Sequence, residues 1–158
     1  MSEQSRSTYR FGDLLALARE YWVREMTEQL ARAGYADYRR SDAALVRLLS
    51  SGPRSITQIG AALRVTRQAA RKLASGLQRR GYARTVRDEH DARQLNVSLT
   101  LRGESFALAI IGTIDTLNQR LASQVDTPQL LAADAVLRAV LPDQRARDHA
   151  ALLIPRPD

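Results

Sequence analysis

The 158-residue sequence predicts a mainly α-helical fold with a small two- to three-stranded β-ribbon. Three observations lead to this fold class. Apolar residues recur every three to four positions over most of the chain, as on one face of a helix. Their spacing changes to every second position near residues 95–99, as in a half-buried strand. Apolar residues make up 44% of the chain, which is enough for a packed core.

Two helices are expected before residue 50. The first spans residues 11–33, and its apolar stripe is formed by Leu15, Trp22, Met26 and Leu30. Gly34 follows it, as expected of a residue that ends a helix. The second helix runs to about Leu49, and Ser41 and Asp42 are both suited to cap its start.

Two short helices joined by a tight turn should follow. Ser55 and Gln58 have the spacing of a capping box, so a helix begins there. Gly60 inside that helix requires another backbone to pack closely against it. Thr66 then caps a helix from Arg67 to about Arg80, and Gly81 closes it.

The ribbon and two further helices complete the chain. Leu95, Val97 and Leu99 alternate with polar residues, and residues 82–87 are suited to pair with them as an antiparallel strand. Residues 88–93 form the polar tip. Thr100 caps a long helix with apolar residues from 101 to 121, and Pro128 lies at the start of a last helix. This order of elements is a winged helix-turn-helix flanked by helices.

Positive charge is concentrated in the same segment. The chain has 24 basic and 17 acidic residues, a net charge of +7. Residues 54–102 contain eleven basic residues and only three acidic ones, so this segment alone carries +8. A solvated charged face would also produce such a segment. Its coincidence with the two short helices and the ribbon favours a polyanionic partner.

A helical wheel of residues 67–80 separates small and apolar side chains from basic and polar ones. Leu73 is expected at the centre of the buried side, among Ala69, Ala70, Gly76 and Leu77. The outer face is formed by Arg67, Gln68, Arg71, Ser75, Gln78 and Arg79, with Lys72 at its edge. Arg and Gln side chains read guanine and adenine in the major groove, so this helix is predicted to bind DNA.

The residues of this segment are predicted to contact DNA in different ways. Arg67, Gln68 and Arg71 lie in the N-terminal half of the helix and are predicted to read bases. Ser55 and Thr57 are placed to bind phosphate through hydroxyls and free amides, in addition to capping. Arg84, Arg87 and Arg93 are predicted to approach phosphates or a narrow minor groove. Asp91 and Arg93 are alternatively a pair that holds the wing tip in shape. The complete predicted DNA-binding set is Ser55, Thr57, Thr66, Arg67, Gln68, Arg71, Lys72, Ser75, Arg84, Arg87 and Arg93.

From Ser41 to Gly103 the chain resembles the MarR family of bacterial transcriptional regulators. The resemblance is carried by residues 59–66 (IGAALRVT), by Leu77 with residues 80–82 (RGY), and above all by the wing. The wing pattern consists of Arg87-Asp88, Asp91-Ala92-Arg93, Leu95, Val97, Leu99-Thr100 and Gly103. Two positions depart from the family pattern, which usually has Ala at Gly60 and often Pro at His90.

The resemblance implies a homodimer that binds a pseudo-palindromic operator in double-stranded DNA. It implies helical dimerisation regions at residues 11–40 and 101–150 around a DNA-binding domain at 41–100. It also implies a transcriptional repressor that is released by a small lipophilic or phenolic effector. Tyr21, Trp22, Tyr35 and Tyr38 are candidates to line an effector pocket, although aromatic residues on an apolar stripe are more often core.

Other function classes receive little support from the sequence. The absence of Cys excludes disulfides, thiolate zinc sites and thiol redox switches. His90 lies between Asp88 and Asp91, but three polar residues at a ribbon tip are usually a solvated turn. We therefore expect no enzyme activity, metal or cofactor, and no membrane segment. The expected location is the cytoplasm, at the nucleoid. The alternatives that stay open are a sequence-independent architectural DNA binder and a winged module that binds protein or RNA.

Overall fold

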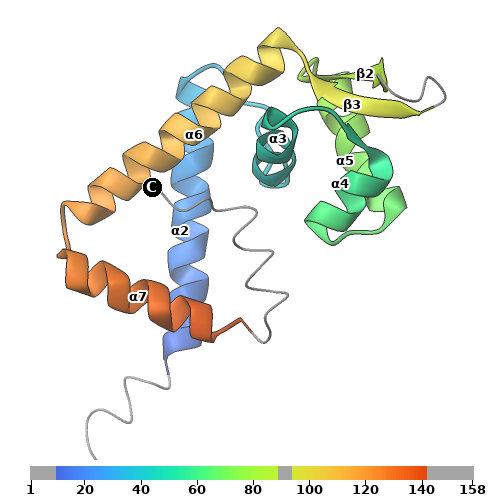
Figure 1. Cartoon of the computed structure of the whole chain (residues 1–158). Helices are drawn as coiled ribbons and strands as arrows, with labels where there is room; N and C mark the ends of the chain where they lie inside the picture. Colours follow the sequence, from blue (N-terminus) through green and yellow to red (C-terminus); the bar gives the residue numbers. More distant parts are fainter. Residues whose placement is uncertain (1–9, 89–93, 142–158) are drawn as a thin grey trace, which may run out of the picture. The chain divides into compact units, whose positions relative to one another are not determined.

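A computed structural model of the chain describes residues 10–88 and 94–141. The chain divides into two compact units, residues 1–40 and residues 41–158. The described part of the first unit is the helix α2 (Phe11–Arg32) and the loop that follows it (Figure 1). Gly34 adopts a φ of 92° just after this helix, which confirms it as the residue at which the chain leaves the helix.

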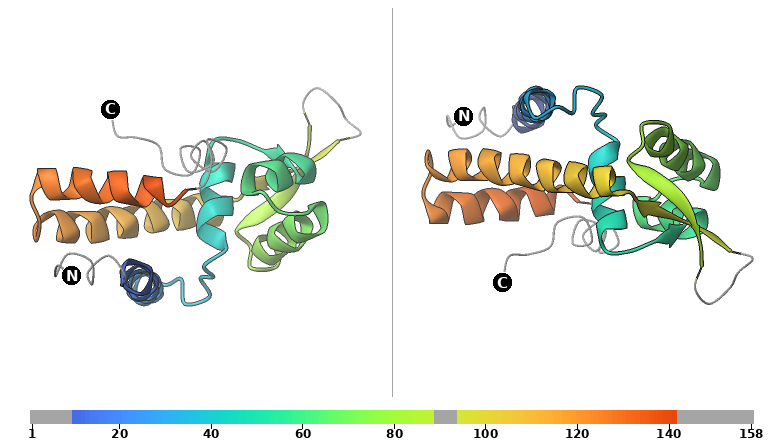
Figure 2. Two further views of the ribbon diagram at one scale, coloured as in Figure 1. Left: turned by 90° about the horizontal axis from the view of Figure 1, so that it is seen from below. Right: turned by 90° about the horizontal axis from the view of Figure 1, so that it is seen from above.

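The second unit contains five helices and a small sheet within its described residues. Its elements are, in chain order, α3 (Asp42–Ser50), β1 (Arg54–Ser55), α4 (Ile56–Leu63), α5 (Arg67–Arg79), β2 (Ala83–Arg87), β3 (Leu95–Leu99), α6 (Leu101–Ala122) and α7 (Thr127–Ala139). The strands form an antiparallel sheet in the order β1-β3-β2. Strands β2 and β3 form a hairpin that extends from the α3–α4–α5 group (Figure 2). The mainly helical winged fold is therefore confirmed.

The helix-turn-helix has the local contacts that the sequence predicts. Ser55 Oγ accepts a hydrogen bond from the Gln58 amide at 3.2 Å, and the Ser55 amide donates to Gln58 Oε1 at 2.8 Å. Thr66 Oγ1 caps α5 by accepting from the Ala69 amide. A Cβ on Gly60 would lie 3.1 Å from the Val65 carbonyl oxygen, so the close backbone approach expected there is present.

Two local predictions were wrong. Ser41 makes no side-chain cap to α3, and Asp42 points into the protein instead, where it pairs with Arg80. Leu73 is only half-buried, because the buried side of α5 is centred on Ala70, Ala74 and Leu77. These two small alanines let α5 approach its neighbours more closely than a helix with a leucine at the centre of its packing face.

A tight junction joins the wing to α6. The Thr100 amide donates to the Tyr82 carbonyl oxygen at 3.1 Å, and the Thr100 hydroxyl donates to the Gly81 carbonyl oxygen at 2.6 Å. The same hydroxyl oxygen accepts from the Gly103 amide and so caps α6 as predicted. The rings of Tyr82 and Phe106, both fully buried, stack with centroids 4.3 Å apart. These contacts fix the start of α6 against the winged helix-turn-helix.

The last described helix is held mainly by local contacts. Asp126 and Gln129 form a capping box at its start, where Pro128 also lies. Near its end the Arg138 guanidinium donates to Asp134 at 2.6 Å, and this hydrogen bond raises the pKa of Arg138 above its ordinary value. No residue of α7 is buried. Among residues 10–88 and 94–141, no helix combines the length and apolar character needed to cross a membrane.

Candidate nucleic-acid interface

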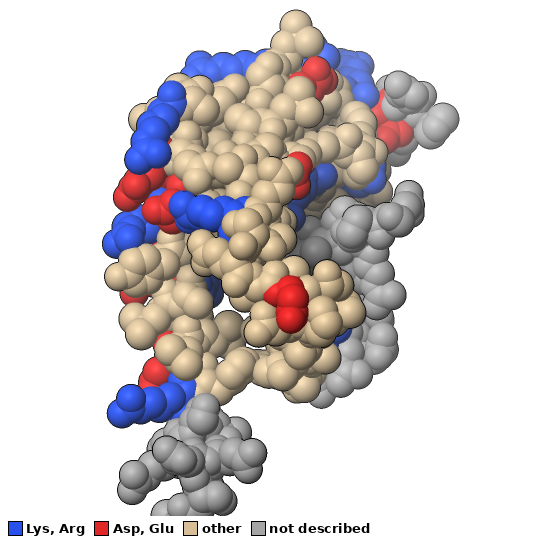
Figure 3. All heavy atoms as spheres, turned by 90° about the vertical axis from the view of Figure 1, so that its left-hand side faces the viewer, with Lys and Arg blue, Asp and Glu red and all other residues tan. Residues whose placement is uncertain are grey.

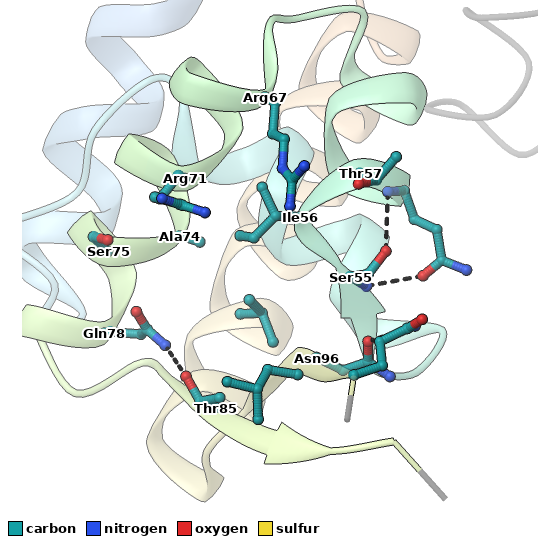
Figure 4. A pocket seen from close by; sticks show the side chains of 14 residues that line it. Ser55, Ile56, Thr57, Arg67, Arg71, Ala74, Ser75, Gln78, Thr85 and Asn96 are labelled. Atoms are coloured by element: carbon teal, nitrogen blue, oxygen red, sulfur yellow. Dashed lines mark hydrogen bonds between the residues drawn. The ribbon is translucent and has the colours of Figure 1, made fainter. Parts of the chain in front are cut away.

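A groove of about 780 Å³ lies between the start of α4, the helix α5 and the face of the small sheet. We call it the α5–wing groove. Figure 4 shows the lining side chains, which come from the start of α4, from α5 and from the strands β2 and β3. The lining residues are Ser55, Ile56, Thr57, Gln58, Arg67, Arg71, Ala74, Ser75, Gln78, Thr85, Gln94, Leu95, Asn96 and Val97.

The groove brings together five residues of the predicted DNA-binding set. Arg67, Arg71 and Ser75 follow one another at intervals of four along α5, so they lie on one side of the helix. Ser55 and Thr57 face them from the start of α4 (Figure 4). Both guanidinium groups are therefore on the same wall, opposite hydroxyl groups and the amide end of a helix.

The other predicted residues do not line this groove. Gln68, Lys72, Arg84 and Arg87 are exposed on the surfaces that flank it. Thr66 is also exposed, and its hydroxyl oxygen is engaged in capping α5. Arg93 and Asp91, including the pair proposed between them, lie outside the described residues.

Sequence analysis missed the contacts that shape the groove. Gln78 Nε2 donates to Thr85 Oγ1 at 2.8 Å and ties α5 to β2 (Figure 4). Asn96 is buried, donates to Asp88 Oδ2 at 2.7 Å and accepts from Gln94 at 3.3 Å. The spacing of Gln78 from Arg71 predicts that Gln78 lies on the outer face of α5. Its partner was not predictable because a hydrogen bond between two elements leaves no periodic signal.

Arg80, one of the basic residues of the charged segment, is not available to bind a ligand. Arg80 donates to both carboxylate oxygens of Asp42, at 2.7 and 2.8 Å, and to the Gly76 carbonyl oxygen at 3.0 Å. Its side chain is 12% exposed and that of Asp42 is 4% exposed. The pair joins the start of α3 to the end of α5. Arg80 is therefore a structural arginine.

The remaining charges make the groove and its surroundings positive. No acidic residue occurs from Arg54 to Arg87 in the sequence, so no carboxylate from these residues offsets the arginines. The N-termini of α4 and α5 add the positive ends of two helix dipoles. Within the described residues no three His, Cys, Asp or Glu side chains gather as a metal site would require. The arrangement suits an extended anion.

Comparison with known proteins agrees with this geometry. A model of the MarR family matches residues 36–94, whereas no curated protein sequence matches the chain. Wild-type MarR from E. coli, in its apo form, is 18% identical with a TM-score of 0.61, over 84% of this chain and 97% of that chain. The transcriptional regulator BldR from Sulfolobus solfataricus is 20% identical with a TM-score of 0.60. The match covers 88% of this chain and 99% of that chain.

A DNA-bound structure is among the similar ones. It contains a mutant of MepR from S. aureus with an oligodeoxyribonucleotide, and it is 20% identical with a TM-score of 0.57, over 83% of this chain and 95% of that chain. At these identities the structures show a common fold. Residues 36–94, which contain the helix-turn-helix and most of the wing, belong to the MarR family, and the chain has the fold of MarR-family transcriptional regulators.

Proposed function

We propose that this protein is a sequence-specific DNA-binding transcriptional regulator that acts as a homodimer on a pseudo-palindromic duplex. The observation that carries the proposal is the exposed face of α5, where Arg67 and Arg71 line a groove without acidic residues. The guanidinium group of an arginine can donate two hydrogen bonds to a guanine in the major groove of DNA. An α-helix fits into that groove. The DNA-bound MepR structure, which shares this fold, supports the same class of ligand.

In such a complex the proposed DNA contacts would come from α5, from the start of α4 and from β2. With α5 in the major groove, Arg67 and Arg71 meet base edges near the N-terminal half of the helix. Ser55 and Thr57 at the start of α4 then meet the phosphate backbone, with the hydroxyl groups of both residues and the Thr57 amide as donors. Arg84 and Arg87, exposed on β2, meet phosphates beside the wing.

Exposed apolar side chains support the homodimer. On α6, on α7 and at the C-cap of α7 they are Leu101, Leu108, Ile111, Leu121, Leu131, Val136, Leu137 and Val140, each at least 40% exposed. Figure 3 views the molecule from the side on which α6 leads into α7, with Lys and Arg in blue, Asp and Glu in red and all other described residues, polar and apolar, in tan. Apolar faces of this extent are typical of protein–protein contacts. A two-fold dimer would place two copies of α5 about one helical turn of DNA apart, ~10 bp.

Selection of the purified protein on random duplexes at physiological salt tests the proposal. We expect enrichment of a pseudo-palindrome with half-sites ~10 bp apart, bound by a dimer. Binding without enrichment would indicate an architectural DNA binder. No binding at low salt would contradict DNA binding and leave a winged interaction module. A repressor role and a lipophilic or phenolic effector are predictions that depend on the family resemblance.

Replacing Arg71 should change sequence preference. Arg71→Ala removes a bidentate donor from the outer face of α5, so we expect a loss of about 1–3 kcal/mol on the preferred base at one position per half-site. Affinity for duplexes that already lack that base should change little. Repeating the selection with the variant measures this, with Arg120→Ala near the end of α6 as the matched control. Equal weakening on all sequences would make Arg71 a phosphate contact.

Replacing Arg87 should change salt dependence instead. Arg87→Gln removes one phosphate contact from each protomer of a dimer, and each contact contributes about 0.9 to the slope of log affinity against log salt. We therefore expect the slope to become shallower by about 1.8 and sequence preference to stay the same. Anisotropy titrations at several salt concentrations measure the slope, with Arg120→Gln as the control. An unchanged slope would remove Arg87 from the interface.

A further inference from the structure

The floor of the α5–wing groove is apolar, although its rim is basic and polar. Ile56 and Leu95 line it from α4 and β3 with accessible side chains, together with the buried Ala74 of α5 and the buried Val97 of β3. Leu95 is 58% exposed, and it is a large apolar side chain beside the exposed Arg87, its partner across the sheet. Hydrogen bonding to phosphate does not require such a floor. An apolar floor therefore indicates that an apolar part of the ligand lies over it.

The proposed DNA complex places one particular part of the duplex there. If α5 enters the major groove and the β2–β3 hairpin approaches the adjacent minor groove, a single sugar–phosphate strand passes between them. The α5–wing groove is the space between these two elements (Figure 4). The phosphates of that strand would meet Ser55, Thr57 and the arginines of the rim. Its sugars would face the floor.

We propose that Ile56 and Leu95 form an apolar seat for the deoxyriboses of this strand, and that the seat rejects a 2′-hydroxyl group. This inference rests on the proposed function. A 2′-hydroxyl is both a donor and an acceptor and loses its water on the floor. The polar side chains that the sheet and the end of α5 contribute to the lining bond to one another or to Asp88: Gln78 with Thr85, and Asn96 with Asp88 and Gln94.

The seat is tested with the selected duplex carrying a single ribonucleotide at each position in turn. A 2′-fluoro nucleotide at the same position is the matched control, because it favours the same sugar pucker without a hydroxyl group. We expect the ribonucleotide to weaken binding about five- to tenfold at one or two adjacent positions per half-site. The 2′-fluoro nucleotide at those positions should change affinity by less than about twofold, a difference of ~0.4 kcal/mol.

Two variants connect this effect to the floor. Leu95→Thr supplies a hydroxyl partner on an exposed strand position and should reduce the ribonucleotide effect to less than about twofold. Ile56→Thr should do the same from the start of α4. The ribonucleotide effect is a ratio of two affinities of the same variant. Leu101→Thr, the same change at an exposed leucine of α6 outside the groove, should therefore keep the full effect even where it weakens the dimer.

Three results would contradict the proposal of an apolar seat. They are the absence of any sensitive position, equal weakening by ribonucleotide and 2′-fluoro nucleotide, and an undiminished effect in both Leu95→Thr and Ile56→Thr. In each of these cases the unmodified duplex is still bound, so the proposed function stands. Failure to bind the unmodified duplex would overturn the proposed function and the seat together.

Discussion

The Asp42→Ala variant should lose about 3–5 kcal/mol of unfolding free energy, because it leaves the guanidinium of Arg80 buried without its carboxylate. Both oxygens of Asp42 accept from Arg80 at 2.7 and 2.8 Å, and neither side chain is more than 12% exposed. Domains of this size are stable by about 5–15 kcal/mol, so the loss is a large share of the total. Urea unfolding at fixed protein concentration measures it as a lower midpoint.

Two further variants separate this effect from a general effect of removing charge. Asp134→Ala also removes a carboxylate from an arginine, but its partner Arg138 is at the surface, so stability should hardly change. The double variant Asp42→Leu with Arg80→Met removes both buried charges and should regain most of the lost stability. An Asp42→Ala midpoint equal to that of Asp134→Ala would show that the buried pair contributes nothing.

The Asp42–Arg80 pair could not be predicted from the sequence. The local pattern around Asp42 predicts a helix cap, and the pattern around Arg80 predicts part of a polyanion-binding segment. The two residues are 38 positions apart, and no periodicity relates them. Which arginines remain free for DNA depends on such distant partners. The net charge of the segment therefore overstates the charge available to a ligand.

The features that were predicted correctly depend on short-range rules. Capping by Ser55, Thr66 and Thr100 was predictable because the hydroxyl and the amide that it caps are three residues apart. The common face of Arg67 and Arg71 follows in the same way from the helical repeat. These local signals located the helix-turn-helix and one wall of the groove.

The floor of the groove was not predictable from alternation in β3. Alternation predicts Leu95 inside and Asn96 outside, whereas Leu95 is exposed and Asn96 is 6% exposed. Asn96 is buried because Asp88 and Gln94 satisfy its amide, which lowers the cost of removing it from water. Leu95 pairs with Arg87 at the end of the hairpin, where the described core no longer covers the strand. Both outcomes depend on neighbours from other parts of the chain.

Gly103→Ala should destabilise the protein by about 3 kcal/mol or more, because the new methyl group has no space. A Cβ at this position would lie 1.9 Å from the Tyr82 carbonyl oxygen and 2.9 Å from its carbonyl carbon. Backbone atoms cannot rotate away, so the start of α6 has to move. That movement breaks the hydrogen bond from Thr100 to Tyr82 and disturbs the cap of α6, which alone contributes about 1 kcal/mol.

Gly112→Ala is the matched control on the same helix. A Cβ there has nothing within 4 Å, so alanine should stabilise α6 by about 0.5–1 kcal/mol through its better helix propensity. Opposite shifts of the urea midpoint are therefore expected from the same substitution, nine positions apart. A Gly103→Ala variant as stable as Gly112→Ala would show that α6 can separate from Tyr82 without cost. In that case the Thr100–Tyr82 junction does not fix the wing to the long helix α6.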